Sequence, residues 1–281
     1  MKIKITSDST CDLSAELINK YDVGIVPLTV LLGNGSFKDG QGIVPQDIFD
    51  YVAKTGQLPK TSAPSVEDYS NYFASLLKSY EAVIHINISS KTSVSNSNAQ
   101  KAAESFKKKV YVIDSLALST GQGLLVLKAC DLVNSGLKPG EIVNKINSLR
   151  AKVNTSFVPD RLDYLHKGGR CSLASMMGAK VLKLHPMIEM GDGQLFAKKK
   201  YRGDMARCIK NYTEDLAVQY PSYDKTRCFI THSCADQELI DLAKKQVAEL
   251  FEFDEVLETT AGSIVTSHCG RNTLGVLFIC K

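Results

Sequence analysis

Hydrophobic and polar positions alternate in two different ways along the first half of the chain. Period-2 alternation at 2–7 and apolar runs at 82–88 and 110–113 predict strands, and 22–32 reads as a strand or extended pair. Amphipathic segments between them predict helices at 14–20, 45–55, 65–80, 93–107, 119–134 and 138–152. Because strands that alternate with helices favour a parallel sheet covered on both faces, we expect a three-layer α/β lobe.

From about residue 154 the predicted strands lie closer together. They fall at 156–159, 186–190, 194–200, 227–232, 255–258 and 273–280, and Gly191-Asp192-Gly193 predicts a hairpin turn. Helices near 203–220 and 236–249 are expected to cover one face of this sheet. We therefore predict an α/β protein of two lobes, an N-terminal α/β domain (1–155) and a C-terminal α+β domain (156–281). The ligand is expected between the lobes, where pockets commonly lie.

Composition restricts the class of protein further. The chain has 281 residues, 44% of them hydrophobic, and a formal net charge of +4, which is ordinary for a globular protein. No apolar run is long enough for a membrane span, and the first residues lack a signal-peptide core, so we expect a cytoplasmic protein without stable membrane insertion. The basic runs at 107–109 and 198–202 are typical of solvated surface, and we expect no nucleic-acid partner.

Hydroxyl- and glycine-rich segments follow several of the predicted strands. They are found at 7–10, 61–65, 89–97, 114–121 and 266–270. Each alone is typical of helix caps or turns, but the carboxyl ends of parallel strands meet at one edge of a sheet. Hydroxyls and free N–H groups at helix starts bind anions, so the set together indicates one site for a negatively charged group.

Familiar catalytic and metal-binding motifs are missing from the sequence. We find no phosphate-binding loop, dinucleotide fingerprint, nucleophile elbow or zinc-protease motif. Cys228, His232 and Cys234 lie close together, but a zinc site there lacks a fourth ligand, so we predict no metal and no cofactor. An anion site without a visible nucleophile or base favours binding over catalysis. A hydrolase or transferase acting on an acyl or phosphate substrate in the same crevice stays open as the alternative.

Several motifs, taken in order, resemble those of the DegV family of bacterial fatty-acid-binding proteins, which includes the binding subunit of fatty acid kinase. The first lobe has Thr6-Ser7-Asp8-Ser9-Thr10-Cys11-Asp12-Leu13, Val26-Pro27-Leu28, Asp39-Gly40, Thr61-Ser62-Ala63-Pro64-Ser65, Ser89-Ser90, Val112-Ile113-Asp114-Ser115 and Gly121-Gln122-Gly123. The second lobe adds Leu165-His166-Lys167-Gly168-Gly169-Arg170, Lys200-Tyr201-Arg202-Gly203 and His268-Cys269-Gly270. Each motif is weak alone, and together they are highly specific.

The resemblance implies a non-catalytic lipid-binding protein that encloses one long-chain fatty acid, with its carboxylate at the lobe junction. By motif, the ligand-binding residues are Thr61, Ser62, Ser93, Arg170 and His268. Arg202 matches a surface arginine that contacts the catalytic subunit of fatty acid kinase, which converts the bound acid to an acyl phosphate in phospholipid metabolism. Leu173, Met176, Met177 and Leu182 are candidates for the wall around the acyl chain.

Two segments depart from the family pattern near the expected head group. The chain has Ser93-Val94-Ser95-Asn96 in place of the usual Ser-Gly-Thr-Tyr, and Gly270-Arg271-Asn272 in place of Gly-Pro-Gly. Two alternatives stay open for Arg271, which either binds the carboxylate or points to solvent. We expect a monomer, while the acyl-chain preference and the partner kinase do not follow from the sequence.

Overall fold

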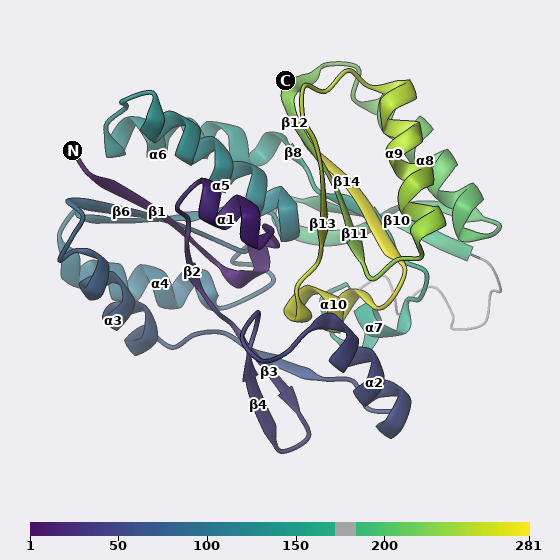
Figure 1. Cartoon of the computed structure of the whole chain (residues 1–281), viewed down its shortest axis with the longest axis horizontal. Helices are drawn as coiled ribbons and strands as arrows, with labels where there is room; N and C mark the ends of the chain where they lie inside the picture. Colours follow the sequence, from purple (N-terminus) through teal and green to yellow (C-terminus); the bar gives the residue numbers. More distant parts are fainter. Residues whose placement is uncertain (172–183) are drawn as a thin grey trace.

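Two lobes, each with its own β-sheet, form the molecule, and a third, smaller sheet projects from them (Figure 1). The computed structural model describes residues 1–171 and 184–281. Within these residues the first sheet takes its strands from residues 3–114 and the second from residues 153–280. The predicted α/β class with two lobes is confirmed, while the exact division at residue 155 stays a prediction.

The first lobe is a three-layer sandwich around a parallel sheet of order β2-β1-β6-β7. Its strands are β1 (Ile3–Asp8), β2 (Gly24–Val26), β6 (Ala82–Asn87) and β7 (Val110–Asp114). One face packs against α1 (Ala15–Lys20), α5 (Ser119–Asn134) and α6 (Pro139–Leu149), and the other against α3 (Val66–Leu76) and α4 (Ser95–Ala103). Because strand side chains alternate, Ile84 and Ile86 pack on the first face and Val83 on the second.

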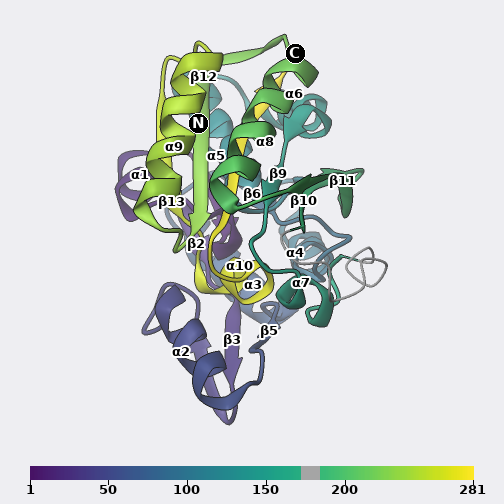
Figure 2. The same ribbon diagram turned by 90° about the vertical axis from the view of Figure 1, so that its right-hand side faces the viewer.

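Pro27 separates two strands that belong to different sheets. The residues before it form β2, and those after it form β3 (Thr29–Leu32), which pairs antiparallel with β4 (Gly35–Lys38) and β5 (Lys60–Ser62). Proline has no N–H to donate to a strand ladder. This small sheet and helix α2 (Pro45–Thr55) extend away from the two lobes (Figures 1 and 2). The sequence pattern does not predict β4 or β5, because strands of three or four residues are too short to show alternation.

The second lobe is built on a mixed sheet of order β11-β10-β9-β14-β12-β13, with β8 also paired to β14. The strands are β8 (Val153–Asn154), β9 (Ser156–Val158), β10 (Leu184–Gly191), β11 (Gln194–Arg202), β12 (Tyr223–Ser233), β13 (Val256–Thr260) and β14 (Thr273–Cys280). β12 and β13 are parallel, and the other pairs are antiparallel. Helices α8 (Met205–Gln219) and α9 (Gln237–Leu250) cover one face, as the sequence predicts (Figure 2).

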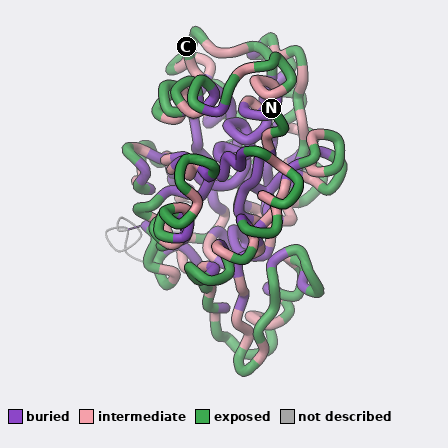
Figure 3. Tube along the Cα trace, turned by 90° about the vertical axis from the view of Figure 1, so that its left-hand side faces the viewer, coloured by how far each residue is buried: buried purple, intermediate pink, exposed green. Residues whose placement is uncertain are grey.

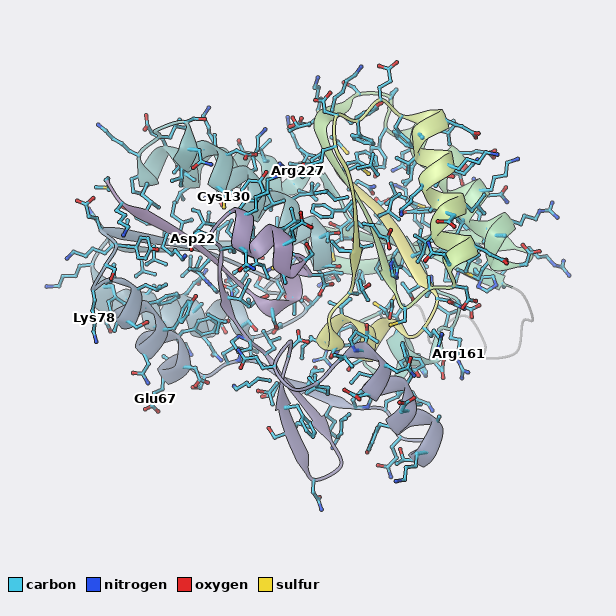
Figure 4. All side chains as sticks on the ribbon, in the orientation of Figure 1. Asp22, Glu67, Lys78, Cys130, Arg161 and Arg227 are labelled. Atoms are coloured by element: carbon cyan, nitrogen blue, oxygen red, sulfur yellow. The ribbon has the colours of Figure 1, made fainter. Side chains whose placement is uncertain are left out.

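Helix α5 lies between the two main sheets and joins the lobes. Phe229 and Leu277 of the second lobe pack in the same apolar cluster as Leu125 of α5 and Ile84 of the first sheet. Beside it Arg227, labelled in Figure 4, reaches across from β12, and its Nη2 donates a hydrogen bond to the Tyr21 hydroxyl at 2.7 Å. Buried residues therefore continue from one lobe into the other (Figure 3).

Two predicted segments differ from the structure in ways that affect the site. The helix expected at 93–107 begins at Ser95, ends at Ala103 and continues as a 3-10 turn. The segment 266–270, expected to be a turn, is the end of helix α10 (Ser263–Cys269). Its hydroxyls bond backbone carbonyls: Thr266 Oγ1 donates to Ala261 O and Ser267 Oγ to Ser263 O. Both hydroxyls thus have local hydrogen-bond partners. The prediction of a turn was wrong because it relied on residue type alone.

Across residues 1–171 and 184–281, no helix combines the length and apolar character that crossing a bilayer requires.

Candidate ligand-binding site

A cavity of about 440 Å³ lies at the junction of the lobes. The first lobe contributes Leu28 just before β3 and residues from β5 and the loop after β6. The second lobe contributes residues from α7 (Asp163–Lys167), β11 and α10. Much of its wall is apolar, with Leu28, Ile88, Leu118, Leu165, Leu195, Ile264 and Val265 among the lining residues. The predicted wall residues Leu173, Met176, Met177 and Leu182 lie outside the described residues.

All five side chains predicted to bind the ligand line this one cavity. Thr61 and Ser62 come from β5, Ser93 from the loop before α4, Arg170 from the segment after α7, and His268 from α10. The structure thus gathers residues that lie as far apart as 61 and 268 in the sequence. Their contact with a ligand stays a prediction.

Thr61 and His268 meet across the lobe junction. Thr61 Oγ1 lies 2.9 Å from Nε2 of His268, while the buried Nδ1 has no hydrogen-bond partner among the described residues. Burial, assisted by the nearby charge of Arg170, lowers the pKa of His268 to about 4, so the ring is neutral at pH 7. An orphan acceptor costs less than an orphan N–H, which favours a proton on Nε2 donated to Thr61. The threonine hydroxyl proton is then free to point into the cavity.

Gly168 allows the close approach behind His268. A Cβ on this glycine would lie 2.6 Å from Nδ1 of His268 and 2.8 Å from the Tyr164 carbonyl. Any side chain here would displace the histidine. The motif Lys167-Gly168-Gly169-Arg170 therefore has a packing role at the site in addition to supplying the arginine.

Ser93 stands two residues before the first turn of α4. Its Oγ lies 2.9 Å from Ser95 Oγ and accepts the Ser95 N–H at 3.2 Å. Val94 follows it, lines the cavity and is 63% exposed. The bulk that replaces the family's glycine thus lies at the cavity mouth.

Ser62 and Arg170 are more exposed than the other predicted ligand residues. Ser62 Oγ is 3.4 Å from the Ala63 carbonyl oxygen, whereas Arg170 Nη1 donates to the Gly168 carbonyl at 2.6 Å. Arg170 also lines a neighbouring polar groove with Lys91 and His166. Two cations, Lys91 and Arg170, therefore line both the cavity and the adjoining groove.

Arg271 lies outside the cavity. Its guanidinium carbon is 5.8 Å from the centre of the Phe49 ring on α2, and the side chain does not line the pocket. Asn272 adopts a left-handed φ of 59°, and its Oδ1 accepts the Asp236 N–H at 3.0 Å. Of the two alternatives left open for Arg271, the structure favours the one in which it points away from the head group.

Arg202 lies at the end of β11, exposed and away from the cavity lining. In the same basic run Lys198 pairs with Glu189, and Lys199 pairs with Asp215. These two lysines are neutralised locally, whereas Lys200 and Arg202 are exposed cations near the strand end.

The cluster of Cys228, His232 and Cys234 has other contacts in the structure. His232 Nε2 lies 3.3 Å from Glu258, and the thiol of Cys228 is fully buried, where burial raises its pKa. Residues 1–171 and 184–281 contain no group of three or more His, Cys, Asp or Glu side chains arranged to hold a metal ion.

Two lobes thus enclose a cavity whose lining combines aliphatic side chains with hydroxyls, an imidazole and a guanidinium. A family model described as "Uncharacterised protein, DegV family" matches residues 2–281, and the chain belongs to the DegV family.

Three similar proteins are described by the fatty acids that they bind. A protein of Thermotoga maritima named "Fatty acid-binding protein" is 28% identical over 98% of this chain and 96% of its own. A solved DegV protein of Thermus thermophilus, described for fatty acid binding, is 28% identical over 100% of both chains, with a TM-score of 0.93. A stearic-acid-binding protein of Eubacterium ventriosum is 27% identical over 99% and 98%, with a TM-score of 0.86.

Proposed function

We propose that this protein binds one long-chain fatty acid in the junction cavity, with the carboxylate at Thr61, Ser93, Arg170 and His268. The observation that carries this proposal is the mixed lining of the cavity, which combines hydroxyls, an imidazole and a guanidinium with aliphatic side chains. Each methylene removed from water contributes about 0.8 kcal/mol, so a C16 chain gains roughly 10 kcal/mol before ordering costs.

The carboxylate accounts for the grouping of the polar residues. Burying an ionised carboxylate without hydrogen-bond partners costs several kcal/mol, and a neutral hydroxyl pair with a nearby cation offsets this cost. The tautomer favoured when Nδ1 has no partner among the described residues donates from Nε2 of His268 to Thr61, which makes the threonine hydroxyl proton available. Arg170 supplies positive charge near His268. The acid is thus expected to bind as its anion.

The geometry supports binding over the alternative of acyl or phosphate hydrolysis. A hydroxyl nucleophile with a histidine base also needs a third group that orients the histidine. His268 Nδ1 has no such partner among the described residues and packs against Gly168 instead. Thr61 and His268 therefore have the contacts of a binding pair.

The second part of the proposal concerns a partner. Arg202 lies outside the cavity on an edge strand, where it is available to the catalytic subunit of a fatty acid kinase. In this scheme the protein holds the acyl chain, the kinase transfers phosphate to the carboxylate, and the protein contributes no catalytic residue.

Calorimetric titration tests the binding proposal directly. Palmitic acid is expected to bind at one site, and hexadecanol, which keeps the chain and lacks the carboxylate, is expected to bind at least tenfold more weakly, since a hydrogen bond to a charged group contributes about 1.5–3 kcal/mol. Equal affinity for palmitic acid and hexadecanol would show that the proposed polar residues do not recognise the carboxylate. Release of product from an acyl ester would instead support the hydrolase.

A further inference from the structure

Helix α10, which carries His268, is held at its first residues by two carboxylates from the other lobe. Asp12 Oδ1 accepts the Gly262 N–H at 2.9 Å, and Asp39 Oδ1 accepts the Ser263 N–H at 2.9 Å. Both aspartates belong to motifs of the first lobe that the cavity itself does not use. They join residues that are 250 and 224 positions apart in the chain.

The two carboxylates converge on one point. A Cβ on Gly262 would lie 3.2 Å from an oxygen of Asp12 and 3.2 Å from an oxygen of Asp39. Asp12 is 6% exposed and Asp39 is 4% exposed, and none of the ion pairs found among the described residues includes either of them. Burial raises the pKa of both groups, that of Asp12 to about 8.

This arrangement exceeds what capping a helix requires. A single exposed Ser or Asp satisfies the free N–H groups at most helix starts, whereas burying two carboxyl groups carries a desolvation cost, which appears as the raised pKa of both. Ser119 offsets part of the cost by donating its hydroxyl to Asp12. A buried polar contact of this kind fixes position, because its donors and acceptor lose their partners when the helix shifts.

The remaining contacts of α10 show what is being positioned. Ile264 packs in a first-lobe cluster with Leu28 and Ile48, while Thr266 accepts a hydrogen bond from Ser233 of the second lobe. The last turn presents His268 to Thr61. A seven-residue helix is about 10 Å long and rigid, so fixing its first residues fixes the histidine at its end.

We propose that Asp12 and Asp39 are positioning residues of the ligand site, which hold α10 so that His268 meets Thr61. This inference rests on the proposed binding of a fatty acid. Asp12 and Asp39 do not line the cavity, and they contribute to affinity through the position of His268. Gly262 allows both carboxyl groups to approach the start of α10, because a Cβ there would contact both of them.

A double-mutant cycle tests the proposal, with palmitic acid as the probe. Asp39→Ala is expected to weaken binding about tenfold in the wild-type protein and less than about twofold in a His268→Ala background, since residues that act as a unit are not additive. Asp39→Asn keeps the acceptor and is expected to recover most of the affinity. Asp68→Ala is the matched control, because Asp68 also caps a helix start, that of α3, but lies outside the cavity lining.

The possible outcomes separate this inference from the function on which it rests. If the wild-type protein binds no fatty acid, the proposed function fails. If it binds, and the losses from Asp39→Ala and His268→Ala add fully, the carboxylates only stabilise the fold and the positioning role is wrong. Should Asp39→Ala fail to fold, the same cycle with Gly262→Ala in place of Asp39→Ala gives the decision, because a Cβ there would contact both carboxyl groups.

Discussion

Thr61 Oγ1 lies 2.9 Å from Nε2 of His268, although 207 positions separate the two residues in the chain. Thr61 belongs to the small sheet of the first lobe and His268 to a helix that precedes the last strand of the second. The contact between Thr61 and His268 therefore forms only when both lobes are folded against each other.

Replacing Thr61 by valine tests this contact with almost no change of shape. Thr61→Val is expected to weaken palmitic acid binding by tenfold or more, because a hydrogen bond to a charged group contributes about 1.5–3 kcal/mol. Thr55→Val is the matched control, since Thr55 is exposed at the end of α2 and bonds only local backbone. Unchanged calorimetric affinity in Thr61→Val would remove the threonine from the site.

Ser93→Ala is expected to lower fatty acid affinity severalfold, because it removes a second hydroxyl from the cavity. Ser97→Ala, four residues on, is the control, since Ser97 Oγ bonds the Val94 carbonyl and the residue does not line the cavity. An acyl-ester cleavage activity that Ser93→Ala abolishes would contradict the binding role and favour the hydrolase.

The raised pKa of Asp12 predicts how stability depends on pH. Its pKa is about 8 in the folded protein against an ordinary 3.8, so between these values the folded state keeps a proton that the unfolded state has lost. The free energy of unfolding therefore falls as pH rises from about 4 to about 8 through this group. Denaturant unfolding at pH 5 and pH 9 should show a smaller loss in Asp12→Asn than in the wild-type protein. An equal loss of unfolding free energy in both proteins would contradict the raised pKa of Asp12.

Arg202→Ala separates partner docking from ligand binding. The variant is expected to bind palmitic acid as tightly as the wild-type protein, because Arg202 lies outside the cavity lining. Phosphorylation of the bound acid by a fatty acid kinase catalytic subunit with ATP should fall at least tenfold if this cation docks the kinase. Arg207→Ala, also exposed and one turn into α8, is the control. Equal phosphorylation in both variants would place the docking surface elsewhere.

Periodicity predicted the larger elements because their apolar spacing follows directly from which face is buried. The predicted helix 45–55 coincides with α2, and Gly191-Asp192-Gly193 forms the expected hairpin between β10 and β11. Short elements carry too few residues for such a signal. The three residues of β5 show no alternation, and the sequence there indicates only a hydroxyl-rich segment.

The candidate site was predicted from motif resemblance, and its geometry was not available from the sequence. Nothing local indicates that Thr61 and His268 face each other, because that contact depends on how the lobes pack. The roles of Asp12 and Asp39 were also missed, since an aspartate after a strand is typical of a turn. Their long-range bonds to Gly262 and Ser263 have no signature in spacing.

Native mass spectrometry of the protein as purified, followed by extraction and identification of the bound lipid, tests the central claim most directly. We expect one C14–C18 fatty acid per chain, which is lost in the Thr61→Ala/Ser93→Ala double variant and retained in Thr55→Ala/Ser97→Ala. An empty cavity that also fails to bind added palmitic acid, or a bound molecule without a carboxylate, would contradict it.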